Sequence, residues 1–111
     1  MQIVVGRNAR AARSEFLAGW AALVEAGRVA AVDGAQPPAD ELLHALTAGT
    51  AASPLVAEGT TGPDDLAVAP LADHDATLLV GRDGHPFRRR ERAQLRALAR
   101  VADRAWTLLD Q

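Results

Sequence analysis

The last third of the chain combines an apolar hairpin pattern with one long amphipathic helix. Residues 66–71 and 76–80 are short apolar runs separated by the turn-forming residues 72–75, which predicts an antiparallel hairpin. Two glycines, Gly81 and Gly84, then lead into a region of helical periodicity. A helix of this kind needs an apolar surface to cover, so the pattern favours an α+β fold in which the helix packs on a sheet.

The final helix has two predicted sides. At about 100° per residue, one side carries these apolar residues: Leu95, Leu98, Ala102, Ala105 and Leu109, widened by Ala99, Val101, Trp106 and Leu108. The opposite side carries an arginine at every fourth position: Arg88, Arg92, Arg96, Arg100 and Arg104. We expect the apolar side to lie on the sheet, with enough width left for a partner helix. Arginines 88–90 oppose the helix dipole and offer no capping side chain.

Two interpretations of the first third remain open. In the first, residues 2–5 form a strand, Asn8 caps a helix that runs to about Ala26, and residues 28–32 form a strand. Four apolar residues at helical spacing favour it: Phe16, Trp20, Leu23 and Val24. In the second, the segment AALVEAGRVAAVDG is a hairpin that turns at Ala26 and Gly27.

The middle of the chain carries turn signals and one short helix. Two prolines break the chain at positions 37 and 38, and residues 41–48 read as a helix opened by Asp40. Residues 50–64 read as a loop around a short strand. Pro70 predicts an edge position or a bulge for the strand 66–71, because it has no N–H to donate. We therefore expect a single domain over residues 1–111: a central antiparallel sheet of about four to six strands, with the first and last helices on one side.

Composition limits the chemistry and the compartment. The chain has no cysteine, which excludes disulfides, thiolate metal sites and thiol nucleophiles. It begins without a signal-peptide pattern and contains no apolar run long enough to span a bilayer. Lysine is absent while arginine and alanine are abundant, as a GC-rich genome produces. We expect a cytoplasmic, bacterial protein.

The charges are strongly partitioned along the chain. Residues 1–28 carry a net charge of +2, residues 29–81 carry eight acids and no arginine, and residues 82–111 carry a net charge of +4. The whole chain has a net charge of -2. This pattern favours an acidic middle that lies beside the basic terminal helices, within one protomer or across a dimer, over the binding of an external polyanion.

Three blocks of the chain resemble the closing half of a GAF domain, a sensory module of signalling proteins. LAVAPL is similar to the family's fourth strand, ATLLV to the strand that follows, and GRDGHPFRRRERAQLRALARVA to the start of its last helix. ELLHALTAGTAASPLVAEG is similar to its helix, glycine turn and third strand, so the resemblance covers about residues 39–107. The chain departs from the family in its arginines 88–90, in a short lid segment, and in lacking cyclic-nucleotide motifs and a bilin-binding cysteine.

The resemblance implies a GAF/PAS-like fold and a small sensory or regulatory module of signal transduction or transcriptional control. Such a module binds a small molecule or a protein partner, such as a kinase or a transcription regulator, and acts as a homodimer. The implied ligand pocket contains Asp40, His44, Thr47, Thr60 and Thr61. We expect the dimer interface to contain Phe16, Trp20, Leu98, Trp106 and Leu109, and we expect these arginines to face a partner: Arg92, Arg96 and Arg100.

No enzyme, metal or cofactor signature stands out. Ser14 and Ser53 lack a nucleophile elbow, and a single Glu-x-x-His step at His44 is too little for a di-iron site. His74, between two aspartates at a hairpin tip, is expected to be exposed to solvent. Two alternatives stay open: an interaction or dimerisation module without a ligand pocket, and a nucleic-acid binder that uses the arginine row. The four aromatic residues look like core residues rather than stacking platforms, which weakens the second alternative.

Overall fold

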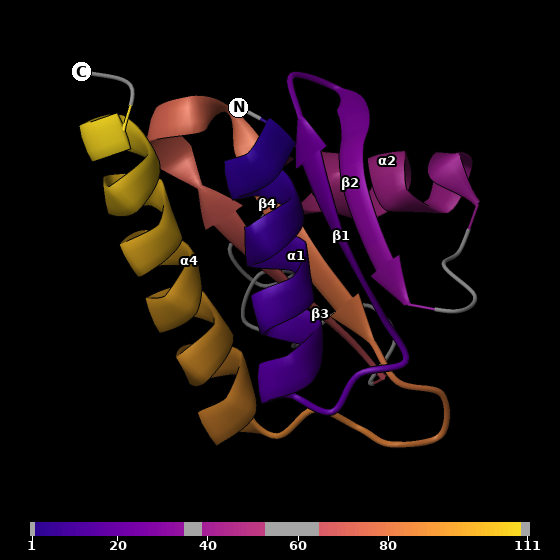
Figure 1. Cartoon of the computed structure of the whole chain (residues 1–111). Helices are drawn as coiled ribbons and strands as arrows, with labels where there is room; N and C mark the ends of the chain where they lie inside the picture. Colours follow the sequence, from indigo (N-terminus) through magenta and orange to yellow (C-terminus); the bar gives the residue numbers. More distant parts are fainter. Residues whose placement is uncertain (1, 35–38, 53–64, 110–111) are drawn as a thin grey trace.

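The computed structural model describes residues 2–34, 39–52 and 65–109 as an α+β sandwich of helices around one sheet. The elements are α1 (Gln2–Glu15), β1 (Trp20–Glu25), β2 (Arg28–Gly34), α2 (Asp40–Ala52), β3 (Leu66–Leu71), the 3-10 turn η1 (Ala72–His74), β4 (Ala76–Gly81) and α4 (Arg89–Leu109). Helices α1 and α4 lie over one face of the sheet, and α2 covers the other (Figure 1). The expected α+β class, with a helix at each end of the chain, is confirmed.

Within the described residues, the sheet has four antiparallel strands in the order β2-β1-β4-β3. The sheet consists of two hairpins, β1–β2 and β3–β4. The hairpins are joined by the pairing of β1 with β4, in which Trp20 lies opposite Gly81. Every residue of β4 is buried, while β2 has exposed positions along its length. Pro70 lies on the edge strand β3 and is exposed, so its predicted edge position is confirmed.

The first third of the chain follows the second of the two interpretations. Residues 2–5 belong to α1 rather than to a strand, and the long helix expected to reach Ala26 is wrong because α1 ends at Glu15. The predicted alternative hairpin is confirmed, with Ala26 and Gly27 both at positive φ in its turn. The helical spacing was misleading because β1 is apolar and buried from Trp20 to Val24 and faces helices on both sides, so it has no alternation to identify it.

Helix α1 ends in a Schellman motif that the sequence conceals. The amide of Ala18 donates to the carbonyl of Arg13 at 2.9 Å, and the amide of Leu17 donates to the carbonyl of Ser14 at 3.3 Å. This places Leu17 at the position where glycine is usual, with a φ of 50° and its side chain 88% exposed. Because no glycine marks this helix end, the sequence pattern predicted a helix that continues beyond Glu15.

The core has two layers, one on each face of the sheet. Between the sheet and α1/α4 lie large apolar side chains that include Phe16, Leu23, Leu78, Leu95 and Trp106. A smaller layer under α2 is built from Trp20, Ala22, Val24, Leu43, Val68 and Leu79. Among the α2 side chains that the structure describes, Leu43 is fully buried against the sheet and Leu46 is half-buried beside it.

The buried side of α4 differs from the expected one by a rotation about the helix axis. Its buried residues are Arg92, Leu95, Ala99, Ala102 and Trp106. Leu95, Ala99, Ala102 and Trp106 confirm the expectation. The other residues of the expected side do not: Leu98 is only half-buried, and Val101, Ala105, Leu108 and Leu109 are exposed. The reason is Trp106: its large ring packs inward and turns the helix toward the Arg92 side.

None of the described helices is long and apolar enough to cross a membrane.

Candidate functional site

The structure does not gather the predicted ligand residues around a described cavity. His44 is exposed on α2, and the hydroxyl of Thr47 donates to the carbonyl of Leu43 at 2.8 Å within the same helix. Asp40 begins α2, but its side chain lies outside the described part of the structure, as do Thr60 and Thr61. The pocket therefore stays a prediction.

Most side chains expected at a dimer interface are used inside the protomer. Phe16, Trp20 and Trp106 are all buried, and the ring of Phe16 meets that of Phe87 edge-on at 6.3 Å. Leu98 is half-buried against the same core, and Leu109 alone of this set is an exposed large side chain. These aromatic residues are therefore core residues, and a dimer needs a different surface.

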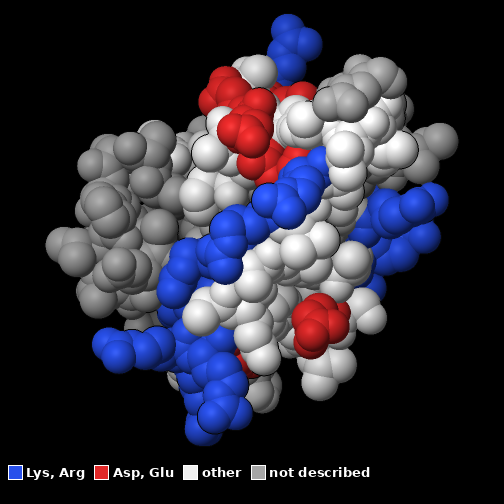
Figure 2. All heavy atoms as spheres, turned by 90° about the vertical axis from the view of Figure 1, so that its left-hand side faces the viewer, with Lys and Arg blue, Asp and Glu red and all other residues white. Residues whose placement is uncertain are grey.

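The arginine row turns from the core to the solvent along α4. Arg92 is only 8% exposed and its guanidinium lies 5.9 Å from the centre of the Phe87 ring. Arg96 is half-buried, and Arg100 and Arg104 are exposed. Residues four apart drift by about 40° around a helix, which explains the diagonal blue band in Figure 2. The expectation that Arg92 faces a partner is wrong, because its side chain packs against Phe87.

Arg82 fastens the start of α4 to the end of α1. Its Nη1 donates to the carbonyl of Phe16 at 2.9 Å, and its Nε and Nη2 donate to the carbonyls of His85 and Pro86 at 3.1 and 3.0 Å. Nη2 also donates to Glu91 Oε1 at 2.6 Å, and the guanidinium lies over the Phe87 ring at 4.1 Å. All three of its nitrogens have acceptors, so Arg82 is a structural residue.

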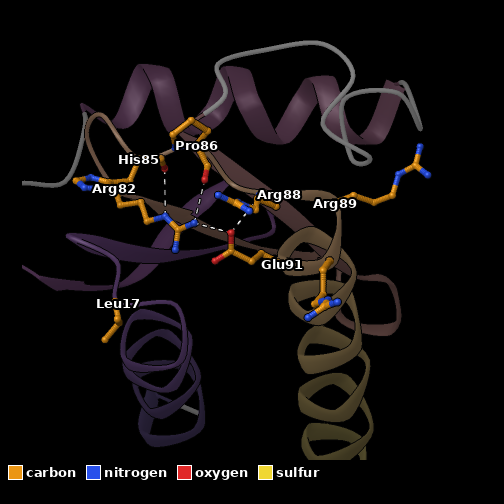
Figure 3. A pocket seen from close by; sticks show the side chains of 8 residues that line it. Leu17, Arg82, His85, Pro86, Arg88, Arg89 and Glu91 are labelled. Carbon is orange, nitrogen blue, oxygen red and sulfur yellow. Dashed lines mark hydrogen bonds and ion pairs between the residues drawn. The ribbon is translucent and has the colours of Figure 1, made fainter.

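An open hollow at the start of α4 surrounds this arginine (Figure 3). Its lining residues are Leu17, Arg82, His85, Pro86, Arg88, Arg89, Arg90 and Glu91. The basic character suggests an anion site, but Glu91 already supplies the anion: it meets Arg82, and its Oε1 accepts the amide of Arg88 at 3.1 Å. Glu91 thereby caps the helix from its third residue, so the expectation that this helix start lacks a capping side chain is wrong.

The hydrogen bond from Arg82, and then that from the Arg88 amide, lower the pKa of Glu91 below its ordinary value of 4.5. A lowered folded-state pKa means that the charged form stabilises the fold above pH 4.5 and that this stabilisation is lost as the pH falls through the lower value. We expect Glu91→Gln to destabilise the protein near neutral pH and to cost progressively less as the pH falls below 4.5 and wild-type Glu91 takes up its proton. Chemical denaturation across this range measures the difference, with exposed Glu15→Gln as the control. A cost that does not change with pH would contradict this role of the charge.

His74, Asp103 and Trp106 form a second polar cluster, at the other end of α4. His74 Nδ1 lies 2.6 Å from Asp103 Oδ1, and its ring stacks on that of Trp106 with centroids 4.2 Å apart. The amide of Asp73 donates to Asp103 Oδ2 at 3.2 Å. The expectation that His74 is exposed to solvent is wrong: its side chain is 13% exposed, because Asp103 and Trp106 fasten η1 to α4. Among the described residues, no group of three His, Cys, Asp or Glu could hold a metal ion.

The outer surface of α4 remains without a covering element in the described part of the chain. We define this outer α4 surface by five exposed residues: Gln94, Ala97, Val101, Ala105 and Leu108. Val101 is 66% and Leu108 is 63% exposed. Arg100 and Arg104 border it on one flank, and Asp73, held to Asp103, lies toward the C-terminal end of the same helix. Figure 2 shows the basic band rising to an acidic group.

The comparisons with known proteins found no relative, so the function has to be argued from these surfaces. No family model matches the chain, so the GAF resemblance of residues 39–107 stays a resemblance. Comparisons with curated proteins and with solved structures also found no match.

Proposed function

We propose that this chain is a small regulatory module that acts by binding a protein through the outer α4 surface. The observation that carries the proposal is the exposure of Val101 and Leu108 on a long, regular helix. A GAF-like module that controls a kinase or a transcription regulator would work in this way, and the resemblance over residues 39–107 supports that role.

The outer α4 surface has the properties of a helix contact. Its apolar side chains follow one line along the helix, with an alanine four residues before and four residues after Val101, whereas scattered apolar residues are ordinary on protein surfaces. Covering a side chain such as Val101 or Leu108 fully is worth about 1.5–3 kcal/mol. Arginines on the flank add selectivity for a partner that carries acidic groups.

The other functions have less support from the described residues. The start of α4 offers no free position for a small anionic ligand, because the carboxylate of Glu91 already lies next to Arg82. A nucleic-acid binder has less support because two of the basic side chains are used inside the protomer: Arg82 donates to backbone carbonyls, and Arg92 is buried. Asp73 and Asp75 are exposed near the C-terminal half of α4 and would repel a polyanion there.

Photo-crosslinking tests this function in cells. A benzophenone amino acid placed at position 101 is expected to give a discrete adduct with a protein after illumination, because the proposed partner protein covers the outer α4 surface in cells. The matched control is the same replacement at Val32, an exposed apolar residue of β2. An absence of discrete adducts at position 101, or an identical pattern at both positions, would overturn the proposal.

A further inference from the structure

We infer that the hollow at the start of α4 binds an acidic segment of a partner protein that also carries a large apolar side chain. The inference goes beyond the proposed function, because the hollow lies where α1 ends and α4 begins and shares no residue with the outer α4 surface. Two unusual features line it from opposite sides (Figure 3): Leu17 at the end of α1, and arginines 88–90 at the start of α4.

Leu17 is the most exposed of the large apolar side chains that the structure describes. It is 88% exposed, and its backbone has a φ of 50°, a conformation that strains every residue except glycine. A glycine would end α1 at this position without the strain. Because the leucine side chain adds almost nothing to the core, the fold alone does not explain it. Strained residues of this kind cluster where proteins bind ligands or partners.

The three arginines are also unfavourable for the fold at the positions that they occupy. They stand at the positively polarised end of α4, where a positive side chain opposes the helix dipole. Within the described part of the chain, the guanidinium groups of Arg89 and Arg90 have no hydrogen-bond or ion-pair partner. A partner that supplies carboxylates would convert these unfavourable charges into charge-assisted hydrogen bonds.

The arrangement of the charges indicates a segment of a protein rather than a small anion. Four arginines and one glutamate line the hollow, and Arg82 is already paired with Glu91, so three arginines remain. Consecutive helix residues point about 100° apart, so arginines 88–90 spread around the rim and do not converge on one point. Several carboxylates along a peptide can reach them at once. With Leu17 across the hollow, the same segment needs an apolar side chain beside its acids.

The shape of the site favours a protein segment over an anionic membrane. The hollow has a volume of about 1010 Å³, enough to hold several side chains. A lipid surface is flat on this scale and would touch only the rim. It would also meet the exposed acids Glu15 and Asp83, which adjoin the lining residues in sequence, whereas a segment inside the hollow need not contact them.

Selection from a library of random peptides displayed on phage tests the inference on the whole chain. We expect the peptides enriched on the wild-type chain to combine several Asp or Glu residues with a neighbouring Leu, Ile or Phe. Their affinity should fall as salt is added, because exposed charges are screened. Enriched peptides without acidic residues, or no enrichment at all, would overturn the inference.

Matched variants show where the selected peptides bind. We expect Leu17→Gly, and the double variant Arg89→Gln with Arg90→Gln, each to raise the dissociation constant of the peptide about tenfold. The controls are Val32→Ser and Arg28→Gln, which change exposed side chains of β2 and should leave the affinity unchanged. A loss in the controls as large as in the test variants would mean non-specific binding and would overturn the inference.

Thermal unfolding of the same variants separates a binding role from a structural one. Leu17→Gly removes a strained residue, and the double arginine variant removes two charges that oppose the helix dipole. Both variants should therefore unfold at a higher temperature than the wild type while they lose the peptide. A lower unfolding temperature together with lost binding would mean that these residues act through the fold, and would overturn the inference.

Two further results distinguish other binding modes. Vesicles that contain an anionic lipid should not retain the chain at physiological salt, and retention that Leu17→Gly abolishes would replace the peptide by a membrane. Peptides that lose affinity in Val101→Ser but not in Leu17→Gly would bind the outer α4 surface, which would overturn this inference and support the proposed function. If crosslinking at position 101 fails while peptides bind the hollow, the proposed function alone fails.

Discussion

Replacing Arg82 with alanine is expected to lower the free energy of unfolding by about 3 kcal/mol. The change removes hydrogen bonds to three carbonyls, those of Phe16, His85 and Pro86, and leaves Glu91 without its cation. Because Arg82 joins the end of α1 to the start of α4, its loss loosens two helix ends at once. Urea denaturation followed by circular dichroism measures the effect.

Two variants show whether the effect is specific to Arg82. Arg104→Ala, on the exposed side of α4, should stay within about 0.5 kcal/mol of wild type. Arg82→Lys keeps the charge but loses the planar fork that reaches several acceptors, so it should recover only part of the stability. An Arg82→Ala protein as stable as Arg104→Ala would show that this network contributes nothing to the fold.

Replacing Gly34 with alanine is expected to cost a comparable amount, about 3 kcal/mol. Gly34 ends β2 with a φ of 115°, where a side chain is strained. A Cβ there would overlap the carbonyl oxygen of Gly19 and lie 2.7 Å from the Cα of Trp20. Both neighbours are backbone atoms of the segment that starts β1, so neither can move without disturbing the centre of the sheet.

Gly27 is the matched control for this prediction. It also has a positive φ, 78°, but a Cβ there meets nothing within 4 Å. Gly27→Ala should therefore show only the backbone penalty of about 1–2 kcal/mol. Thermal and urea denaturation of the two variants separate the close approach at Gly34 from the cost of a left-handed residue. Equal losses would mean that the contact with β1 does not matter.

The C-terminal half of the fold was predictable because its signals are local. The turn residues 72–75, the break at Gly81 and the proline of β3 lie next to the elements that they define. The start of the chain lacked such signals. Leu17 holds the position where glycine usually ends a helix, and β1 is apolar without alternation, so helix and strand fitted equally well.

The sites were harder to predict because they join distant residues. Arg82 reaches Phe16 across 66 positions, and His74 reaches Asp103 across 29, and no sequence spacing indicates either contact. The exposed side of α4 was misplaced because helical periodicity gives the width of an apolar face but not its centre. Trp106 decides that centre: by packing inward with Leu95 it leaves Val101 and Leu108 outside.

Cysteine labelling in living cells tests most directly whether the outer α4 surface binds a protein. The chain has no cysteine of its own, so a single Val101→Cys or Val32→Cys residue reports its surroundings alone. Both positions are exposed in the protomer, on α4 and on β2 respectively. Because cellular thiols also consume a maleimide, the labelling rate of Val101→Cys is compared with that of Val32→Cys under the same conditions. We expect the ratio of the two rates, position 101 to position 32, to be several times lower in cells than in dilute purified protein. An equal ratio in the two conditions would show that the surface is uncovered and would contradict the account.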